Sequence, residues 1–173
     1  MNLSLKTIRL RFVEELDAEF ILKLRLDSRY NKFLSNVSDD IQVQRDWIKK
    51  YKVDEGNKEQ FYFIIERLDG VPCGTVRIYD LKEDSFCWGS WILNEDKTPY
   101  SAWECSYLIY KFGFEVLKCN KSHFNVMKGN EGVINFHKKM GAIEMYEDEK
   151  NLFFMITQQD VTQYFNKVIK III

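Results

Sequence analysis

Three strand patterns follow one another between residues 60 and 93, and this run most restricts how the chain can fold. Residues 60–66, 71–80 and 86–93 are rich in apolar, β-branched and aromatic side chains. The turn sequence LDG separates the first two patterns, and residues 82–84 separate the second from the third. Strands joined by such short turns pair in antiparallel order. The centre of the chain is therefore predicted to be an antiparallel meander.

Helical patterns, in which apolar residues recur every three or four positions, flank this meander. We expect helices over residues 17–27, 39–53, 101–117, 130–140 and 160–170, with further strands over 8–13, 121–127, 143–146 and 151–157. Strands that first cluster and later alternate with helices predict an α/β (α+β) fold, with a mixed, mostly antiparallel central sheet flanked by helices. Because 173 residues suffice for one core, we expect a single domain over residues 1–173.

Composition excludes several classes of protein. Hydrophobic residues make up 46% of the chain, which argues against disorder, and the net charge of −1 gives no reason to expect nucleic acid as a partner. No apolar run reaches the ~20 residues of a membrane span, and the first residues lack a secretory signal. The aromatic final strands and the apolar tail VIKIII are compatible with a homodimer.

The four cysteines give no sign of a metal site. Cys73, Cys87, Cys105 and Cys119 are scattered without C-x-x-C spacing, which argues against both zinc and a disulfide framework. Free thiols without an export signal favour the cytoplasm.

The segment NEGVINFHKKMGA, residues 130–142, is a short helix pattern with a clear start and end. Asn130 is a good N-cap, and Gly141 stands where a helix C-terminus favours a left-handed residue. His137, one of only two histidines, lies inside this helix. By itself the pattern is equally consistent with plain structure.

The order of elements resembles the GNAT N-acetyltransferase superfamily, in particular the branch that acetylates ribosomal-protein N-termini and nucleotide-linked amino sugars. The helix resembles the family's late motif, in which an apolar residue, an aromatic ring and a glycine follow an Asn by three, seven and eleven positions. Asn130, Val133, His137 and Gly141 fall on these steps. The resemblance implies a GNAT fold and acetyl transfer from acetyl-CoA to a primary amine.

The resemblance also implies a CoA site between a strand and a helix, where backbone N–H groups hold the pyrophosphate. The segment KTPYSA falls on the family's signature, with Lys97 as the cation and Ala102 as the small residue. Tyr100 replaces a glycine, and Pro99 removes one donor. The implied cofactor-binding residues are Ile92, Leu93, Asn94, Lys97, Thr98, Tyr100, Ser101, Ala102 and Asn130.

His137 occupies the step where the family usually carries a tyrosine that protonates the CoA thiolate. An imidazole with an unperturbed pKa of ~6.5 suits this role, so His137 is the predicted catalytic residue, with helix-end packing as the alternative. The usual base would be a Glu, but Cys87 takes that step. Glu83, Asp84 and His123 are alternative bases, and an amine of low pKa needs none.

Aromatic and arginine side chains suggest where an acceptor could bind. Arg29 and Tyr30 follow the first helix, whereas Arg77 and Trp88 belong to the meander, and these four are the predicted substrate-binding residues. The resemblance favours a nucleotide-linked deoxy-amino sugar of surface-glycan synthesis as the acceptor. A peptide N-terminus or another small amine is the first alternative, and a catalytically silent CoA-binding or interaction module is the second.

Overall fold

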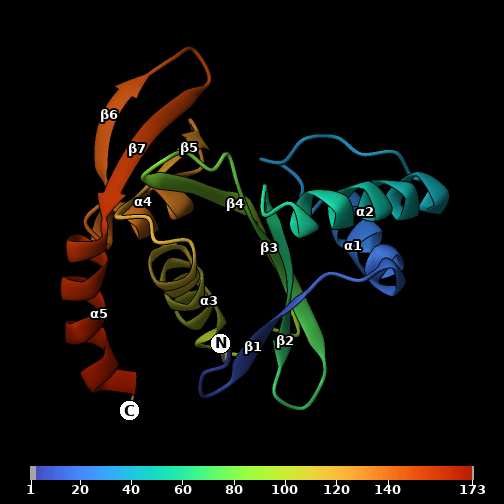
Figure 1. The fold of residues 1–173 in the computed structure, drawn as a ribbon, viewed down its shortest axis with the longest axis horizontal. Helices are drawn as coiled ribbons and strands as arrows, with labels where there is room; N and C mark the ends of the chain where they lie inside the picture. The colour runs from blue at the N-terminus through green and yellow to red at the C-terminus, as the bar shows by residue number, and fades with distance from the viewer. Residues whose placement is uncertain (1–2, 173) are drawn as a thin grey trace. The chain divides into compact units, whose positions relative to one another are not determined.

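The computed structural model describes residues 3–172, and side chains as far as residue 168. The apolar tail on which the homodimer prediction partly rests therefore lies, from residue 169 on, outside the described side chains. Figure 1 traces the chain from the N-terminal strand to the C-terminal helix.

The strands and helices follow the predicted order. The strands are β1 (Ile8–Phe12), β2 (Phe61–Arg67), β3 (Pro72–Tyr79), β4 (Ser85–Leu93), β5 (Lys121–Met127), β6 (Ile143–Glu147) and β7 (Asn151–Thr157). The helices are α1 (Ala18–Leu26), α2 (Ile41–Gly56), α3 (Ser101–Lys111), α4 (Glu131–Lys139) and α5 (Gln158–Ile172). A 3₁₀ turn (Glu15–Asp17) precedes α1, and a π-helical segment (Phe112–Val116) follows α3.

In the part of the chain that the structure describes, the sheet has seven strands in the order β1-β2-β3-β4-β5-β7-β6. The pairs β1–β2, β2–β3, β5–β7 and β6–β7 are antiparallel, and β4–β5 is parallel. This confirms the prediction of a mixed, mostly antiparallel sheet. The chain divides into two compact units, Met1–Asp80 with Gly89–Leu108 (unit 1) and Leu81–Trp88 with Ile109–Ile173 (unit 2). The prediction of a single domain stays a prediction.

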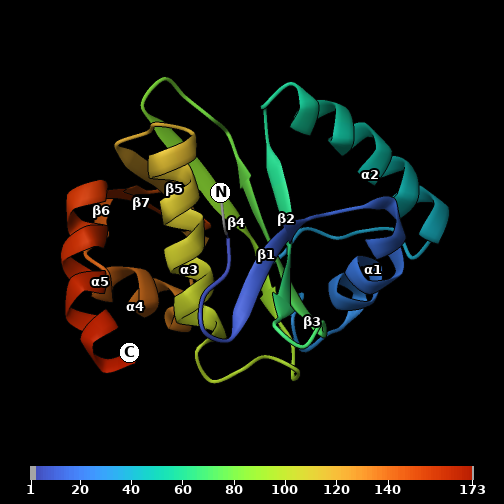
Figure 2. The ribbon, with the colours of Figure 1, turned by 60° about the horizontal axis from the view of Figure 1, so that its bottom comes forward.

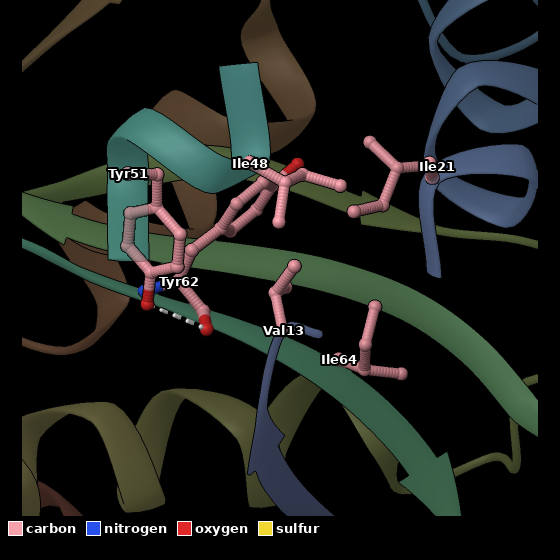
Figure 3. Close-up of a cluster of buried hydrophobic side chains, with 7 residues drawn as sticks. Val13, Ile21, Ile48, Tyr51, Tyr62 and Ile64 are labelled. Carbon is pink, nitrogen blue, oxygen red and sulfur yellow. Dashed lines mark hydrogen bonds between the residues drawn. The ribbon is translucent and has the colours of Figure 1, made fainter. Parts of the chain in front are cut away.

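In unit 1, α1 and α2 cover one side of strands β1 to β3, as Figure 2 shows. Figure 3 shows the cluster between them, in which Ile21 of α1 and Ile48 of α2 meet Ile64 of β2. These three side chains are at most 1% exposed. Because burying each such side chain contributes about 1.5–3 kcal/mol, the cluster fixes both helices on the strands.

Tyr51 ties α2 to β2 by hydrogen bonds as well as by packing. Its hydroxyl accepts a bond of 2.7 Å from the backbone N–H of Tyr62, and its ring meets the Tyr62 ring edge-on. The hydroxyl also lies 3.3 Å from the Tyr62 carbonyl (Figure 3) and close to Glu55. Tyr62 is thereby held where its ring reaches a pocket described below.

In unit 2, β5 pairs with β7 and β7 with β6. Figure 1 shows β6 and β7 as neighbouring orange-red arrows, with α5 continuing from the end of β7. The side chains of β6 are exposed, including Ile143, Met145 and Tyr146 at 55–63%.

The π-helical segment was not predicted, because the sequence indicates one regular helix over residues 101–117. Gly113 lies in this segment, and a Cβ at Gly113 would come within 2.1 Å of the Phe86 ring. The chain therefore needs glycine here, since any side chain would enter the space of a buried aromatic ring. The widened helical turn accommodates this close approach.

Candidate functional site

His137 lies on the buried face of α4, inside an aromatic enclosure in unit 2. Its ring centroid is 4.2 Å from that of Phe124, 5.2 Å from that of Trp88 and 5.7 Å from that of Phe136. Only 5% of His137 is exposed, and Nδ1 has no hydrogen-bond partner in the described part of the chain. Burial lowers the pKa of His137 to about 3. The ring is therefore neutral at physiological pH.

This placement argues against the predicted role of His137 as proton donor. With a pKa of about 3, roughly one ring in ten thousand would carry the extra proton at pH 7. A neutral imidazole is a far weaker acid than an imidazolium, so it is poorly suited to protonating a thiolate. Packing at the end of the helix, the alternative reading, agrees better with the structure.

The two ends of α4 behave largely as the sequence indicates. Asn130 occupies the N-cap position, and Gly141 after the helix has a φ of +102°. The Asn130 side chain forms no capping hydrogen bond, however, which corrects the expected cap. Its amide is thus not used by the helix and stays a candidate contact for CoA.

The loop between β4 and α3, residues 94–100, is shaped by its own polar side chains. The side-chain amide oxygen Oδ1 of Asn94 accepts a bond of 2.9 Å from the Asp96 N–H, and the Asn94 backbone N–H donates to the Cys73 carbonyl. The Thr98 N–H donates to the Ser101 hydroxyl at 2.9 Å, and Ser101 is fully buried. Asn94, Thr98 and Ser101 therefore hold the loop in shape, whatever contact they make with a ligand.

Glu104, in the first turn of α3, fixes the start of this helix to β1. Its carboxylate accepts bonds of 3.0 and 3.1 Å from the backbone N–H groups of Thr7 and Ile8, and one of 2.9 Å from the Thr7 hydroxyl. Glu104 is 3% exposed. A buried carboxylate with several donors is stable, so it orients the N-terminus of α3 within unit 1.

The start of α3 suits a phosphate group in its chemistry. The first N–H groups of a helix lack carbonyl partners within the helix and attract anions. Lys97 is exposed and provides a cation, while Ala102 adds little bulk. Tyr100, which stands where the family carries a glycine, is 45% exposed. The structure thus gathers eight of the nine predicted cofactor-binding residues in unit 1, and Asn130 belongs to unit 2.

A polar pocket of about 260 Å³ opens in unit 1, between α1, the loop that follows it, α2 and strands β2 to β4. Its lining residues are Ile21, Arg25, Ser35, Asn36, Val37, Gln44, Trp47, Tyr62, Arg77 and Ser90. Of the four predicted substrate-binding residues, this pocket contains Arg77. It also contains Trp47, which was predicted to lie on the apolar face of a helix but was not predicted to be a site residue.

Ser90 lines the same pocket with an unusual backbone. Its φ is +48°, in the left-handed region, although it lies within strand β4 and is not a glycine. Such a conformation is costly for a non-glycine residue and is found often at functional sites. No residue pattern around Ser90 predicts this conformation.

The predicted residues Arg29 and Tyr30 line a different pocket, of about 210 Å³, in unit 1. Arg29 pairs with Asp27 at 2.6 Å and with Glu95 at 3.4 Å, and the Tyr30 hydroxyl donates to Glu95. These bonds join the loop after α1 to the loop before α3. Because the charge of Arg29 is already paired and the Tyr30 hydroxyl already donates to Glu95, these residues offer less to an anionic acceptor than Arg77 does.

Trp88, the fourth predicted substrate-binding residue, is part of the core. It is 4% exposed, and its ring meets Tyr110 edge-on at 5.6 Å. A ring enclosed in this way presents no face to an acceptor, which opposes the prediction. The site residues as a whole stay predictions.

Two of the three alternative bases, Asp84 and His123, are engaged in structural contacts. Cys87 is buried, His123 Nδ1 lies 2.8 Å from the Ser85 hydroxyl, and Asp84 accepts bonds from Asn120 that lower its pKa. Within residues 3–172, no cluster of His, Cys, Asp and Glu is arranged to hold a metal ion. In the same range, no helix is both long and apolar enough to cross a membrane.

Comparison with known families decides the identity of this fold. Residues 7–143 match the family described as "Acetyltransferase (GNAT) domain". The chain belongs to the GNAT acetyltransferase family. This confirms the predicted family, the predicted fold and the prediction that the protein is an acetyltransferase. A search of curated proteins found no match.

Solved structures agree with this assignment. A protein described as "Apo FdhC- a nucleotide-linked sugar GNAT" is 47% identical, with a TM-score of 0.89 and coverage of 96% of each chain. The ribosomal-protein-S5-alanine acetyltransferase from Vibrio fischeri is 12% identical, with a TM-score of 0.78 and coverage of 92% of this chain and 98% of that one.

A spermidine N-acetyltransferase from Vibrio cholerae, solved in complex with CoA and spermine, is 15% identical, with a TM-score of 0.73 and coverage of 90% of this chain and 98% of that one. At 12% and 15% identity, the two Vibrio proteins show a shared fold and no more.

Proposed function

We propose that this protein transfers the acetyl group of acetyl-CoA to the primary amine of a nucleotide-linked amino sugar. The observation that carries the proposal is the 47% identity, over 96% of each chain, to a protein described as a nucleotide-linked sugar GNAT. Spermidine and ribosomal-protein acetyltransferases share only the fold at 15% and 12% identity, so polyamines and protein N-termini are less favoured acceptors.

Acetyl-CoA supplies an activated acetyl thioester, and the products are an N-acetylated sugar and CoA with a free thiol. In this proposal the N–H groups at the start of α3 and the ammonium of Lys97 hold the phosphates of CoA. Glu104 supports this site indirectly, because its bonds to β1 fix the helix whose first N–H groups bind the phosphates. The partly exposed side chain of Leu93 continues the binding surface along β4, whereas Ile92 is 3% exposed and supports it from the core.

The buried His137 supports a reaction that does not depend on it as an acid. An amine on a sugar ring has a lower pKa than an alkyl amine, so a useful fraction is deprotonated near neutral pH without a dedicated base. Water can return the proton to the leaving thiolate, whose own basicity is modest. Catalysis then rests on holding the two substrates together, which can account for most of a rate enhancement of this kind.

The test is an assay of thiol release from acetyl-CoA with a panel of acceptors. The panel contains nucleotide-linked amino sugars, the same nucleotide sugars with a hydroxyl in place of the amine, a peptide with a free N-terminus, and spermidine. Release confined to the amino sugars supports the proposal. Release with the peptide or spermidine, and not with the amino sugars, overturns the acceptor.

The same assay separates the enzyme from a silent module. Cys87 at the usual position of the base and Tyr100 in the CoA loop are the features that favour a module without turnover. Binding of CoA, measured by calorimetry, with no thiol release from any acceptor would support that second reading. Lys97→Ala should weaken CoA binding, whereas Lys50→Ala, at an exposed position on α2, should not.

A further inference from the structure

Two arginines share the 260 Å³ pocket of unit 1 without a carboxylate to balance them. Among the described residues, neither Arg25 nor Arg77 forms an ion pair. The chain as a whole has 26 acidic and 25 basic side chains, so carboxylates are not scarce. The Nε atoms of both are buried and have no hydrogen-bond partner. Burial and the proximity of Arg77 lower the pKa of Arg25, as expected of a desolvated cation beside another cation.

Aromatic rings hold Arg77 in this pocket. Its guanidinium carbon lies 4.6 Å from the centroid of the Tyr79 ring and 5.8 Å from that of Trp47. Trp47 is itself fixed, because it stacks on Tyr51 at 5.8 Å with an angle of 4° between the planes. Cation–π contacts use the face of a guanidinium and leave the N–H groups at its edge available to a ligand.

Arg25 is held by the loop that follows α1. One of its terminal nitrogens donates to both the carbonyl and the hydroxyl of Ser35, each at 2.8 Å. A surface arginine is free to pair or to remain in water, but these two are positioned by neutral groups and partly removed from water. Such an arrangement is unfavourable unless an anion completes it.

We propose that Arg25 and Arg77 together bind phosphate oxygens of the acceptor, namely the diphosphate that links nucleotide and sugar, an inference that rests on the proposed function. Guanidinium groups bind phosphates through paired N–H donors in a fork. A diphosphate carries at least two negative charges and enough oxygens for both forks. A carboxylate has one charge and two oxygens, and it would satisfy only one. The pocket therefore selects acceptors by their phosphates, whereas the amine is presented elsewhere.

The test titrates uridine diphosphate into the protein saturated with CoA, so that the phosphate site at α3 is filled. Arg25→Gln and Arg77→Gln should each weaken binding about tenfold or more, because each removes a charged hydrogen-bonding group. Arg77→Lys should lose most of the affinity too, since an ammonium lacks the fork. Arg45→Gln, at an exposed position on α2 outside the pocket, is the matched control and should bind as the wild type does.

The inference is wrong if uridine diphosphate binds Arg25→Gln and Arg77→Gln as tightly as it binds the wild type. It is also wrong if the two variants lose as much affinity for CoA as for uridine diphosphate. A sugar carboxylate without phosphate that competes better than uridine diphosphate would overturn it as well. Unchanged melting temperatures show that the variants fold. The outcome is distinct from that of the proposed function. Arginine-dependent binding without acetylation of any amino sugar supports this pocket and refutes the proposed acceptor, whereas acetylation with an unchanged acceptor KM in both variants refutes the pocket alone.

Discussion

The rings of His137 and Phe124 lie 4.2 Å apart, centroid to centroid, with 39° between their planes. This contact places the one titratable group of α4's buried face in an apolar environment, where its Nδ1 has no partner among the described residues. A charged imidazolium buried here would lose its hydration by water, and no neighbouring group would replace it with a hydrogen bond or an opposite charge. His137, the residue that the family motif highlights, therefore contributes to the stability of the fold through its packing on Phe124.

The first prediction concerns the pH dependence of stability. The pKa of His137 is lowered from 6.5 to about 3 in the folded state, so the unfolded chain binds this proton more readily. Stability is therefore full above pH 6.5 and falls as the pH decreases toward 3. At pH 5 the loss from this group is about 2 kcal/mol.

Urea unfolding at pH 7.5 and pH 5 measures this difference. In His137→Phe the part of the slope due to His137 should vanish, and His123→Phe shows how much any other histidine contributes. A His137→Phe protein that loses as much stability between the two pH values as the wild type would contradict the prediction.

The second prediction concerns turnover. His137→Phe keeps an aromatic ring and removes the nitrogen atoms, so the enclosure by Trp88 and Phe124 should persist. If His137 packs and does not donate a proton, kcat should remain within about threefold of wild type at pH 7. A loss of about 10–100-fold in kcat, with unchanged acceptor KM and melting temperature, would instead restore the acid role of His137.

The third prediction compares two glycines in helical segments. A Cβ at Gly113 would enter the Phe86 ring at 2.1 Å, whereas none of the surrounding atoms lies within 4 Å of a Cβ at Gly132. Gly113→Ala should lower the free energy of unfolding by about 1–3 kcal/mol, because the core is overpacked. Gly132→Ala should raise it by about 0.5–1 kcal/mol, because alanine favours a helix.

Denaturant unfolding of both variants makes the comparison. Combining Gly113→Ala with Phe86→Leu should cost less than the sum of the two single changes, since the smaller side chain relieves the clash. Simple additivity of the two changes would show that the close approach to Phe86 is not the cause.

The fourth prediction concerns the anchor between α3 and β1. Glu104→Gln keeps the shape but replaces an acceptor oxygen by an NH₂ group that cannot accept from the Thr7 and Ile8 N–H groups. We expect a loss of about 1–3 kcal/mol in stability and a weaker affinity for CoA. Glu115→Gln, at an exposed position, should change neither. Calorimetry with CoA and thermal melting measure the two effects. A Glu104→Gln variant that is less stable but binds CoA with unaltered affinity would show that this anchor does not contribute to CoA binding.

The fifth prediction uses a left-handed residue. Lys118 follows the π-helical segment with a φ of +61°, a conformation that glycine adopts without strain. Lys118→Gly should therefore be neutral or stabilising by up to about 1 kcal/mol. Lys50→Gly, within α2, should destabilise by about 1 kcal/mol. Thermal melting ranks the two, and equal destabilisation would contradict the role of φ.

Features that depend on neighbouring residues could be predicted. The end of α4 at Gly141 and the hairpin turn at Gly70 follow from local backbone preferences, and both glycines have positive φ in the structure. The burial of His137 had a signal too, since Ile134, His137 and Met140 recur every three residues and all three are buried. That spacing indicates a core position more directly than an exposed catalytic one.

Features that depend on distant contacts could not be predicted. The π-helical segment exists because Gly113 passes over Phe86, 27 positions earlier in the chain. The pocket joins Arg25 of α1 to Arg77 of β3, and nothing in either local sequence indicates that no carboxylate accompanies them. Trp88 and Arg77 looked alike as candidates, yet one is core and the other lines the pocket.

The sequence by itself determined the order of the elements, the turns at Gly70 and Gly141, and the resemblance that led to the acetyltransferase family, because these depend on periodicity and on short motifs. Only the tertiary structure decided which charges are paired, which rings are buried and where a phosphate could bind. Desolvation and ion pairing depend on what surrounds a side chain in space, and residues far apart in the chain supply those surroundings.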